Sequence, residues 1–306
     1  MERLKLFLAK NKIEFELNFD VSCLSSIKLG TKARIAIFPK KVKDLEKVLM
    51  FCNASKIHFK VVGCASNILF VSDVSFPLIV TSKMKDEIVF DGKYVNVSAG
   101  VSISKFSEFL KKNNLSGFEG LVGIPASVGG AIMNNAGAFG YSISDKLVKV
   151  SVFKKGKIFD VFASDIKFGY HYSNLSGLIV LTATFLFENK NEYDIINLCN
   201  KFTFLRNKSQ PSGLSLGSVY SKTYGKSAGF FIERAGLKGV RVGGIVVSNK
   251  HANFFVNDKF GTALDFLRLS ALVEKTVEKQ FGVTLVPEIE KVGEKNEITS
   301  RLPCSF

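Results

Sequence analysis

The sequence has no tryptophan and only 3 histidines, and it lacks the long apolar runs of a membrane protein. No apolar run approaches the roughly 18 residues that cross a bilayer. The apolar stretch 6–9 near the N-terminus is too short for a signal-peptide core, and no small-residue cleavage site follows it. We therefore expect a cytoplasmic protein with no membrane partner.

Cysteine is scarce and scattered. There are 5 cysteines, an odd number with no C-x-x-C pair: Cys23, Cys52, Cys64, Cys199 and Cys304. A disulfide framework or a zinc site needs clustered cysteines. The sequence therefore predicts reduced thiols and no metal.

Acidic residues are fewer than basic ones, which gives a formal net charge of +15. The lysines are spread along the chain as singles and pairs, and no block of five basic residues occurs. A nucleic-acid-binding protein typically gathers its charge into one patch. The charge therefore does not predict a nucleic-acid partner, and a basic groove for an anionic small molecule fits it as well.

Two common nucleotide-binding signatures are also missing. No G-x-G-x-x-G follows a predicted strand, so a Rossmann site is unsupported. Gly225-Lys226-Ser227 resembles the end of a phosphate-binding P-loop, but Tyr220 stands where the first glycine should be. Any nucleotide must be held in another way.

The most unusual stretch that is present is 118–140, FEGLVGIPASVGGAIMNNAGAFG, which has 6 glycines and hardly any charge. Glycine permits positive φ angles and a close approach of the backbone to another group. Backbone N–H groups need partners, and a phosphate-bearing cofactor along this loop would supply them. A packed bend of small residues is the alternative. A second small-residue turn, 63–67, follows a predicted strand, and two such loops can hold one extended dinucleotide from two domains.

Hydrophobic periodicity and turn signals divide the chain into three blocks, 1–85, 86–192 and 193–306. Helices are expected at 43–54 and 103–112, and a long one from Thr262 with Asp265 in a capping box and Gly282 at its stop. Strands are expected at 58–62, 78–81 and 179–187, and hairpins at 88–97 (with an Asp91-Gly92 turn), 148–162 and 245–257. The pattern predicts a compact α+β chain with mixed or antiparallel sheets, not a doubly wound one.

Four polar residues stand in contexts that suit a functional site. Ser218 lies in the polar run QPSGLSLGSVYSK, where it is alternatively a plain loop residue. Glu288 is a carboxylate in an apolar, proline-marked strand, and it is either solvent-facing or functional. His171 lies in the aromatic turn FGYHYS, where a stacked structural histidine is the alternative. Asn253 lies in SNKHANF, which also fits a simple hairpin connection.

Taken in order, five segments resemble the UDP-N-acetylenolpyruvoylglucosamine reductase family, flavoenzymes of bacterial peptidoglycan precursor synthesis. The segments are VVGCASNIL, GFEGLVGIPASVGGAIMNNAGAFG, FGYHYS, QPSGLSLGSVYSK with AGFFIERAGLKG, and VVSNKHANFFVN with LVPEIEKVG. Their order and spacing are specific and cover nearly the whole chain. The resemblance implies an FAD-binding module of the vanillyl-alcohol-oxidase type, with subdomains at 1–85 and 86–192, and a C-terminal α+β substrate domain at 193–306. It also implies the shorter family type, which lacks a tyrosine-bearing insertion.

The resemblance further implies a reaction in which NADPH reduces FAD and the reduced flavin delivers a hydride to the enolpyruvyl ether of a UDP-sugar. Ser218 matches the family's proton donor, and Glu288 matches a glutamate that stabilises or protonates the same intermediate. His171 stands where the family has an arginine that steadies the enolate. The expected substrate-binding residues are Lys222 and Asn253. The expected FAD-binding residues are Gly63, Cys64, Ala65, Ser66, Asn67, Gly120, Gly123, Ile124, Pro125, Ala126, Ser127, Gly130, Asn135 and Gly137.

Several positions depart from the family pattern. Histidine at 171 supplies one positive charge or donor but not the bidentate fork of arginine. Ala65 and Ala126 replace expected glycines, and Lys222 is displaced from the usual F-K-N-P. Two alternatives therefore stay open: a flavin oxidase of the same fold with another substrate, and a flavin- or nucleotide-binding protein that has lost catalysis. The expected partners are the UDP-sugar and NADPH, and the expected state is a monomer.

Overall fold

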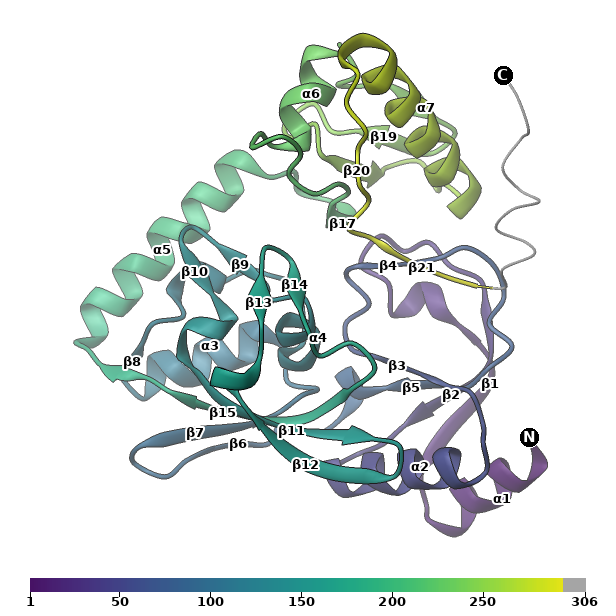
Figure 1. Ribbon diagram of the computed structural model, residues 1–306, viewed down its shortest axis with the longest axis vertical. Helices are drawn as coiled ribbons and strands as arrows, with labels where there is room; N and C mark the ends of the chain where they lie inside the picture. Colours follow the sequence, from purple (N-terminus) through teal and green to yellow (C-terminus); the bar gives the residue numbers. More distant parts are fainter. Residues whose placement is uncertain (294–306) are drawn as a thin grey trace. The chain divides into compact units, whose positions relative to one another are not determined.

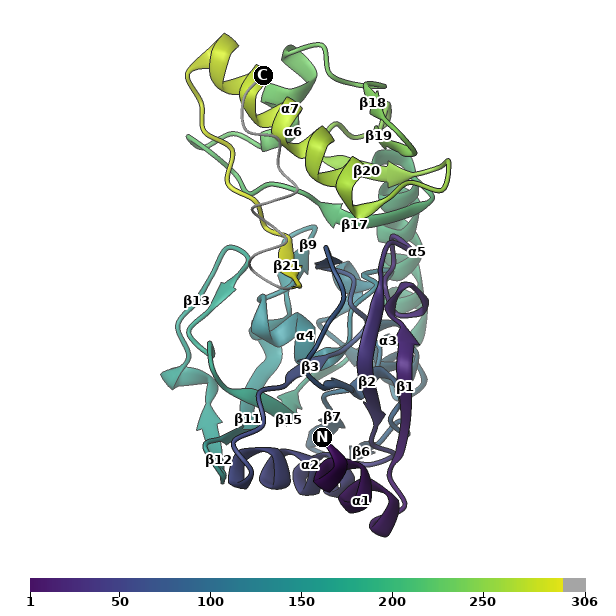
Figure 2. The ribbon, with the colours of Figure 1, turned by 90° about the vertical axis from the view of Figure 1, so that its right-hand side faces the viewer.

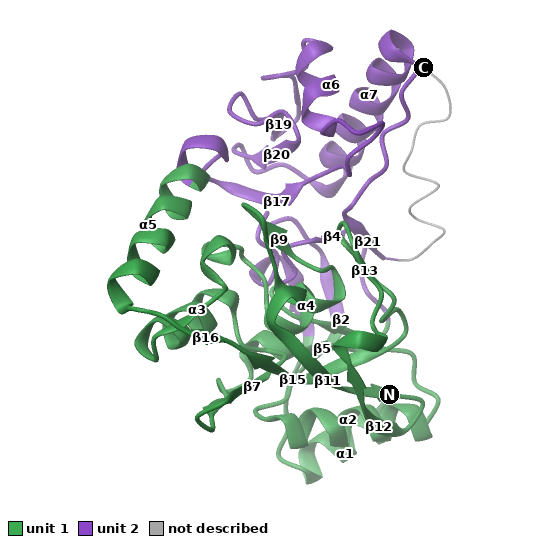
Figure 3. Ribbon diagram, turned by 60° about the vertical axis from the view of Figure 1, so that its left-hand side comes forward, with its two compact units in different colours: residues 1–17, 35–64, 76–206 green, residues 18–34, 65–75, 207–306 purple. Residues whose placement is uncertain are grey.

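The computed structural model describes residues 1–293, which form two compact units (Figure 3). Unit 1 consists of Met1–Leu17, Ile35–Cys64 and Phe76–Arg206, and unit 2 consists of Asn18–Arg34, Ala65–Ser75 and the described chain from Asn207 onward. Each unit is therefore assembled from stretches that lie far apart in the sequence. Within the described residues, no helix is both long and apolar enough to cross a membrane.

Unit 1 contains most of a sheet with strand order β1-β2-β5-β3, with two helices beside it (Figure 1). The end of β1 from Asn18 and the start of β2 up to Arg34 are counted with unit 2. The elements are α1 (Glu2–Lys10), β1 (Glu14–Asp20), β2 (Lys32–Phe38), α2 (Val42–Ala54), β3 (Lys60–Val62) and β5 (Leu78–Val80). Strands β2, β5 and β3 run parallel. Helix α2 forms on an apolar stripe whose members are all buried: Leu45, Val48, Leu49 and Cys52.

A second, five-stranded sheet of unit 1 has the order β12-β11-β15-β7-β6, and its neighbouring strands are antiparallel. The elements are β6 (Ile88–Phe90), β7 (Tyr94–Ser98), α3 (Ile103–Lys112), α4 (Val128–Met133), β11 (Leu147–Lys154), β12 (Lys157–Phe162) and β15 (Ile179–Leu186). Helix α4 packs against β7 and β15. Four phenylalanine rings with centroids 5.1 to 6.4 Å apart fill the core beneath α3: Phe106, Phe118, Phe185 and Phe187.

Short antiparallel pairs and one long helix complete unit 1. The pairs are β8 (Leu115–Ser116) with β16 (Glu188–Asn189), β9 (Gly137–Ala138) with β10 (Tyr141–Ser142), and β13 (Phe168–Gly169) with β14 (Tyr172–Ser173). The 3₁₀ turns are η1 (Val21–Cys23) in unit 2 and, in unit 1, η2 (Thr81–Lys83), η3 (Glu119–Leu121), η4 (Ile143–Lys146) and η5 (Ala163–Asp165). Helix α5 (Glu192–Ser209) belongs to unit 1 as far as Arg206.

Unit 2 is built on an antiparallel sheet with the order β17-β20-β19-β18. The elements are β17 (Leu214–Ser218), α6 (Ala228–Arg234), β18 (Arg241–Val242), β19 (Ile245–Val247), β20 (Phe254–Asn257) and α7 (Ala263–Phe281). Helix α7 packs against β18 and β19 (Figure 2). A separate parallel pair joins β4 (Ile68–Phe70) to β21 (Glu290–Val292). The core of this unit is therefore closed by chain segments from both ends of the sequence.

Helix α7 follows every signal that predicted it. The Thr262 hydroxyl accepts a hydrogen bond from the Asp265 N–H at 3.1 Å, and the Asp265 carboxylate accepts one from the Thr262 N–H at 2.8 Å. Gly282 ends the helix with a left-handed φ of 64°. Apolar residues at helical spacing form its buried stripe, which includes Phe266, Leu269, Val273 and Val277. The capping box and the stop are confirmed.

The other predicted helices and hairpins are confirmed, but two local details are wrong. The turn of the β6–β7 hairpin is centred on Gly92-Lys93, because the Asp91 N–H donates to the Tyr94 carbonyl at 3.2 Å. The Asp91 carboxylate accepts from the N–H groups of Lys93 and Tyr94, which favours aspartate at the first turn position. Glu288 precedes β21 in an extended segment rather than lying in a strand.

The three-domain division at 85 and 192 stays a prediction. The described chain has three hydrophobic clusters, of which two lie in unit 1 and one in unit 2. Cys23, Cys52, Cys64 and Cys199 are free thiols, and Cys304 lies outside the described residues. Among residues 1–293, no three His, Cys, Asp or Glu side chains are grouped as a metal site requires.

Candidate functional site

Two of the predicted cofactor segments meet inside unit 1, where β3 ends. A Cβ atom added to Gly63 would lie 2.1 Å from the Ser127 Oγ, so a side chain at this position would clash. Ser127 is buried and caps α4, accepting a hydrogen bond from the Gly130 N–H at 3.3 Å. The turn at Gly63 and the start of α4 therefore fit together only because their residues are small.

The glycine-rich stretch 118–140 is only partly a loop, because it contains η3, α4 and β9. The expectation of a continuous loop is wrong here. A Cβ at Gly120 would lie 2.5 Å from the Tyr141 ring, and one at Gly129 would lie 2.8 Å from the Ala99 Cβ. Of the glycines in this stretch, Gly123 and Gly140 have a positive φ. Most glycines in this stretch are therefore explained by neighbouring protein atoms that leave no space for a side chain, and only two by a positive φ angle.

The surface-facing part of this stretch lies between η3 and α4. Gly123 and Pro125 are exposed, while Ile124 and Ala126 are half-buried. The Ile103 N–H donates to the Ala126 carbonyl at 2.9 Å, which ties the segment to α3. Ala126 does not have a positive φ, so alanine fits its backbone without strain. The segment therefore has exposed residues that a ligand can reach, and its backbone is held in place by α3.

Asn135 connects the end of α4 to the predicted His171 turn. Its Nδ2 donates to the Gly169 carbonyl at 2.9 Å, and the Ser173 hydroxyl donates to the Met133 carbonyl at 2.7 Å. The Asn135 Oδ1 is buried, and no donor in the described chain reaches it. The β13–β14 hairpin therefore sits on the C-terminal end of α4, and Asn135 keeps one acceptor for a ligand.

His171 lies at the tip of this hairpin in a left-handed conformation with a φ of 51°. Burial lowers the pKa of the His171 imidazole below its ordinary value. The imidazole is therefore mainly neutral at pH 7, since a histidine with an unshifted pKa is already mostly neutral there. A neutral histidine supplies a hydrogen bond rather than a full positive charge.

These features of unit 1 fit a dinucleotide cofactor. Small residues at 63, 127 and 130 let the turn at Gly63 pack directly against the start of α4. The segment at 123–125 is exposed, and the Asn135 Oδ1 is an unused buried acceptor. Phosphates and flavin rings bind to backbone N–H groups and to a few well-placed polar atoms.

In unit 2, the segment that carries Ser218 leaves the end of β17. A register shift between Ser215 and Ser218 bulges the strand, and Gly217 has a left-handed φ of 78° in the bulge. The next residue, Val219, donates its N–H to the Asn253 carbonyl and accepts a bond from the Glu288 N–H, both at 2.9 Å. The backbones of Ser218 and Glu288 therefore lie on neighbouring segments.

Residues 65–67, the part of the predicted turn 63–67 that belongs to unit 2, contact the same part of that unit. The Asn67 Nδ2 donates to the Glu288 carbonyl at 3.0 Å, and the Asn67 carbonyl accepts from the Glu290 N–H at 3.0 Å. Ala65 adopts a left-handed φ of 47°, which glycine tolerates better. The structure therefore places the Asn67 turn against the predicted carboxylate residue and explains why a glycine is expected at 65.

The Asn253 side chain forms two hydrogen bonds with the backbone of Tyr220. Its Oδ1 accepts from the Tyr220 N–H at 3.0 Å, and its Nδ2 donates to the Tyr220 carbonyl at 2.7 Å. Asn253 is only 5% exposed, so both polar ends of its side chain are used inside the protein. This contact holds the segment between Ser218 and the exposed Lys222.

The sequence analysis did not predict that the buried Tyr220 side chain helps to hold this segment in place. The Tyr220 hydroxyl lies 2.8 Å from the Ser270 Oγ, which in turn donates to the Glu274 carboxylate at 2.9 Å. Burial, together with the Glu274 charge, raises the pKa of Tyr220 well above its ordinary value, so the phenol stays protonated. The tyrosine in place of the family's phenylalanine was the available signal, because a buried tyrosine hydroxyl needs a partner.

The predicted site residues divide between the units, and their roles stay predictions. Unit 1 holds Gly63, Cys64, Gly120, Gly123, Ile124, Pro125, Ala126, Ser127, Gly130, Asn135, Gly137 and His171. Unit 2 holds Ala65, Ser66, Asn67, Ser218, Lys222, Asn253 and Glu288. The contacts above join Gly63 to Ser127 and Asn135 to the His171 hairpin in unit 1. In unit 2 they join Asn67 to Glu288 and bring both to the segment after Ser218, whereas no such contact among the described residues connects Cys64, Gly137 or Ser66.

The comparisons with known proteins agree along the chain. Residues 33–161 match the FAD binding domain family, and residues 210–292 match the C-terminal domain of UDP-N-acetylenolpyruvoylglucosamine reductase. The chain is 38% identical over 295 residues to the UDP-N-acetylenolpyruvoylglucosamine reductase of Caldicellulosiruptor saccharolyticus, covering 94% of each chain. It is 36% identical over 284 residues to that of Lactococcus lactis subsp. cremoris, covering 92% of this chain and 95% of the relative.

A solved structure supports the same assignment. The crystal structure of UDP-N-acetylenolpyruvylglucosamine reductase (MurB) from Thermus caldophilus superposes with a TM-score of 0.77 at 29% identity. The match covers 92% of this chain and 99% of that chain. The chain therefore belongs to the UDP-N-acetylenolpyruvoylglucosamine reductase family, and it carries the FAD-binding domain of these oxidoreductases.

Proposed function

We propose that this chain reduces the enolpyruvyl ether of UDP-N-acetylglucosamine enolpyruvate to UDP-N-acetylmuramate, with NADPH as the electron donor. The reaction is a step of peptidoglycan precursor synthesis, and we place it in the cytoplasm. Relatives that carry this enzyme's name match more than nine-tenths of the chain. The observation that carries the proposal is the hydrogen bond from the Glu288 N–H to the carbonyl of Val219, the residue after Ser218.

The small-residue segments are the proposed FAD site. Gly63 packs directly on Ser127 at the start of α4, which fixes the turn, and Asn135 offers a buried acceptor. When bound, FAD takes electrons from NADPH and supplies the hydride for the vinyl methylene carbon of the substrate. Ser66 and Asn67, which belong to unit 2, stay predicted FAD-binding residues.

Ser218 is the proposed proton donor. Addition of a hydride to the vinyl methylene carbon moves the π electrons to the carbon next to the carboxylate, and that carbanion takes one proton. A serine hydroxyl is a poor acid, so it must be aligned and the acceptor must be strongly basic. The bulge at Gly217 and the anchored Tyr220 fix the backbone on both sides of Ser218. Glu288 is half-buried nearby and assists the same intermediate.

Lys222 is the proposed contact for the anionic groups of the substrate. It is exposed on the segment that follows the anchored Tyr220. A lysine ammonium suits a phosphate or carboxylate as a point charge. Asn253 has its side chain on the Tyr220 backbone, so we assign it the placement of this segment.

One observation favours a second candidate, a slow or catalytically impaired member of the family. The pKa of His171 is lowered by burial, whereas an arginine at this position would stay charged. A neutral imidazole stabilises a developing enolate less than a guanidinium does. The same protein would then bind FAD and the UDP-sugar but turn over slowly.

The test is an anaerobic visible spectrum of the purified protein. We expect a flavin band that bleaches when NADPH is added and recovers when UDP-N-acetylglucosamine enolpyruvate follows. Bleaching without recovery would support the impaired candidate. A colourless protein that cannot be reconstituted with FAD would contradict both proposals.

A further inference from the structure

Arg206 lies in the last turns of α5 and reaches the glycine-rich stretch of unit 1. Its Nε donates to the Val122 carbonyl at 3.0 Å, and its Nη2 donates to the Gly120 carbonyl at 3.3 Å. Both carbonyls belong to the segment that leads into the exposed turn at Gly123. A guanidinium is suited to this task because it presents several donors in one rigid plane.

The same side chain also shapes the turn that follows. A Cβ added to Gly123 would lie 3.1 Å from the Arg206 Cδ, and Gly123 has a left-handed φ of 83°. Glycine is therefore required at 123 both for its φ angle and for the space that Arg206 takes. The arginine and the glycine form one fitted contact.

Arg206 contacts the other end of the stretch as well. Its guanidinium carbon lies 5.3 Å from the centroid of the Phe139 ring, within the range of a cation–π interaction. Phe139 stacks on Phe202, one helical turn before Arg206 on α5, with centroids 5.2 Å apart and planes at 17°. One side chain therefore holds the segment that ends at Val122 and the ring that lies near Gly140.

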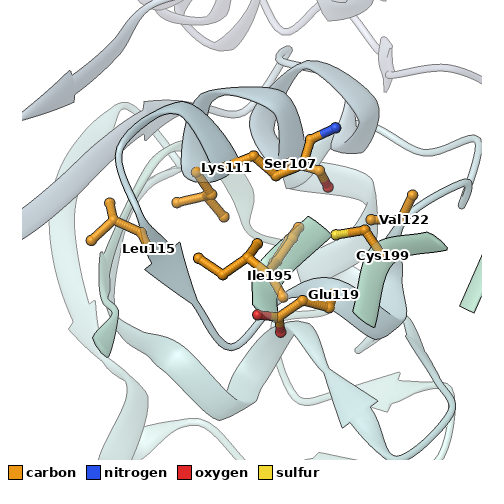
Figure 4. A pocket seen from close by; sticks show the side chains of 9 residues that line it. Ser107, Lys111, Leu115, Glu119, Val122, Ile195 and Cys199 are labelled. Carbon is orange, nitrogen blue, oxygen red and sulfur yellow. The ribbon is translucent and has the colours of Figure 1, made fainter. Parts of the chain in front are cut away.

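Away from Arg206, the packing between α5 and this stretch is incomplete. A pocket separates α3, η3 and α5, and Figure 4 shows Ile195 and Cys199 of α5 beside Glu119 and Val122. The Ser107 Oγ beside this pocket is buried and has no partner within residues 1–293.

We propose that Arg206 is a positioning residue for the cofactor, which fixes the backbone of 120–123 in the conformation that accepts FAD. This inference rests on the proposed function, in which the same stretch binds FAD. Arg206 acts through the two carbonyls and the Phe139 ring and touches no reacting atom. Affinity for FAD should therefore fall when the guanidinium is lost, even though the cofactor-facing residues are unchanged.

The test compares Arg206→Met, Arg206→Lys and Lys208→Met, the last of which removes a positive charge from an exposed position of the same helix. FAD is titrated into each apoprotein and followed by flavin fluorescence, and amide hydrogen exchange is measured without FAD. We expect Arg206→Met to weaken FAD binding roughly tenfold to hundredfold, because hydrogen bonds from a charged group are among the stronger ones. Exchange should rise in 119–127 and stay unchanged in the strands of the five-stranded sheet.

The lysine variant and a chemical rescue sharpen the result. Lysine can reach one carbonyl but cannot span two in a plane, so Arg206→Lys should fall between wild type and Arg206→Met. Methylguanidine added to Arg206→Ala should restore part of the FAD affinity, which a general loss of stability would not allow. If Arg206→Met does not fold, the lysine variant and the rescue carry the test.

Unchanged amide exchange in 119–127 with unchanged FAD affinity would overturn the proposal, and so would an equal loss of FAD affinity in Lys208→Met. A general rise of exchange across unit 1 would also overturn it, because it would indicate a structural role only. Failure of the wild-type protein to bind FAD would contradict the proposed function instead. The exchange measurement would still decide whether Arg206 positions the segment.

Discussion

The glycine-rich stretch of unit 1 and the Ser218 segment of unit 2 are fixed in different ways. In unit 1, small residues allow the backbone itself to pack closely, as at Gly63 against Ser127. In unit 2, the buried amide of Asn253 and the buried Tyr220 hydroxyl hold an irregular segment from beneath. The first arrangement leaves the exposed turn at 123–125 on a fixed base, where we propose that FAD binds, and the second fixes the backbone beside Ser218, the proposed proton donor.

The comparison predicts that the two segments respond to different substitutions. In unit 1 an added methyl group should lower stability, because the close packing leaves no space for it. In unit 2 the removal of a polar group should lower stability, because hydrogen bonds hold the segment. The predictions below run from the largest expected effect to the smallest.

Asn253→Ala should be the most destabilising change. It leaves the N–H and the carbonyl of Tyr220 buried without their partner, which costs about 2–4 kcal/mol of unfolding free energy. Urea unfolding measures this loss. Asn249→Ala, at an exposed position close by in the sequence, is the matched control and should change stability little. A normal stability with a raised KM would instead favour direct substrate binding by Asn253.

Gly63→Ala should destabilise unit 1 by about 1–3 kcal/mol and weaken FAD binding, because the new methyl group meets the Ser127 Oγ. Differential scanning calorimetry and FAD titration measure the two effects. Gly229→Ala is the control, since a Cβ there makes only ordinary contacts at 3.5 Å or more. Equal behaviour of the two variants would contradict the close-packed turn.

His171→Arg should raise turnover by about tenfold, because a permanent charge replaces an imidazole whose pKa is lowered by burial. Wild-type turnover should increase as the pH falls below the ordinary histidine pKa of about 6.5, while the arginine variant should not show this increase. Complete inactivation of His171→Arg would show that the site is built around histidine.

The stability of the folded protein should decrease as the pH falls, whereas its turnover should increase. The folded protein disfavours the charged form of His171, so protonation at low pH favours the unfolded chain. The contribution of His171 to the unfolding free energy is therefore complete above pH 6.5 and declines as the pH falls toward the lowered pKa. His171→Gln should weaken this dependence, as measured by urea unfolding across that range.

Ala65→Gly should have the smallest effect. Alanine at a φ of 47° is strained, and glycine relieves that strain but adds freedom to the unfolded chain. The net gain should be up to about 1 kcal/mol by urea unfolding. Ala126→Gly is the comparison, because Ala126 lacks a positive φ and should gain nothing. Equal gains at both positions would contradict the strain at 65.

Local signals predicted the regular elements well. The helix from Thr262 to Gly282 could be predicted because its cap, its buried stripe and its stop are short-range patterns. The β6–β7 turn was displaced by one residue because the Asp91 side chain competes for the turn's N–H groups. Boundaries of this kind depend on a single side-chain hydrogen bond.

The contacts that hold the site in place could not be predicted. Arg206 lies more than 80 residues from the carbonyls that it binds, and Ser270 lies 50 residues from Tyr220. Neither pair has a local pattern, because each depends on which segments the fold brings together. The sequence motifs predict which segments face ligands, whereas the side chains that hold those segments could be found only from the structure.

The central claim is that the glycine-rich stretch binds FAD and that Ser218 donates the proton. The most direct test follows the two half-reactions of Ser218→Ala by anaerobic stopped-flow absorbance. NADPH should bleach the flavin within about twofold of the wild-type rate, and recovery on addition of the UDP-sugar should slow about hundredfold or more. Ser215→Ala on the same strand should leave both rates unchanged. Equal slowing of both half-reactions in Ser218→Ala, or no slowing of either, would contradict the assignment of the proton to Ser218.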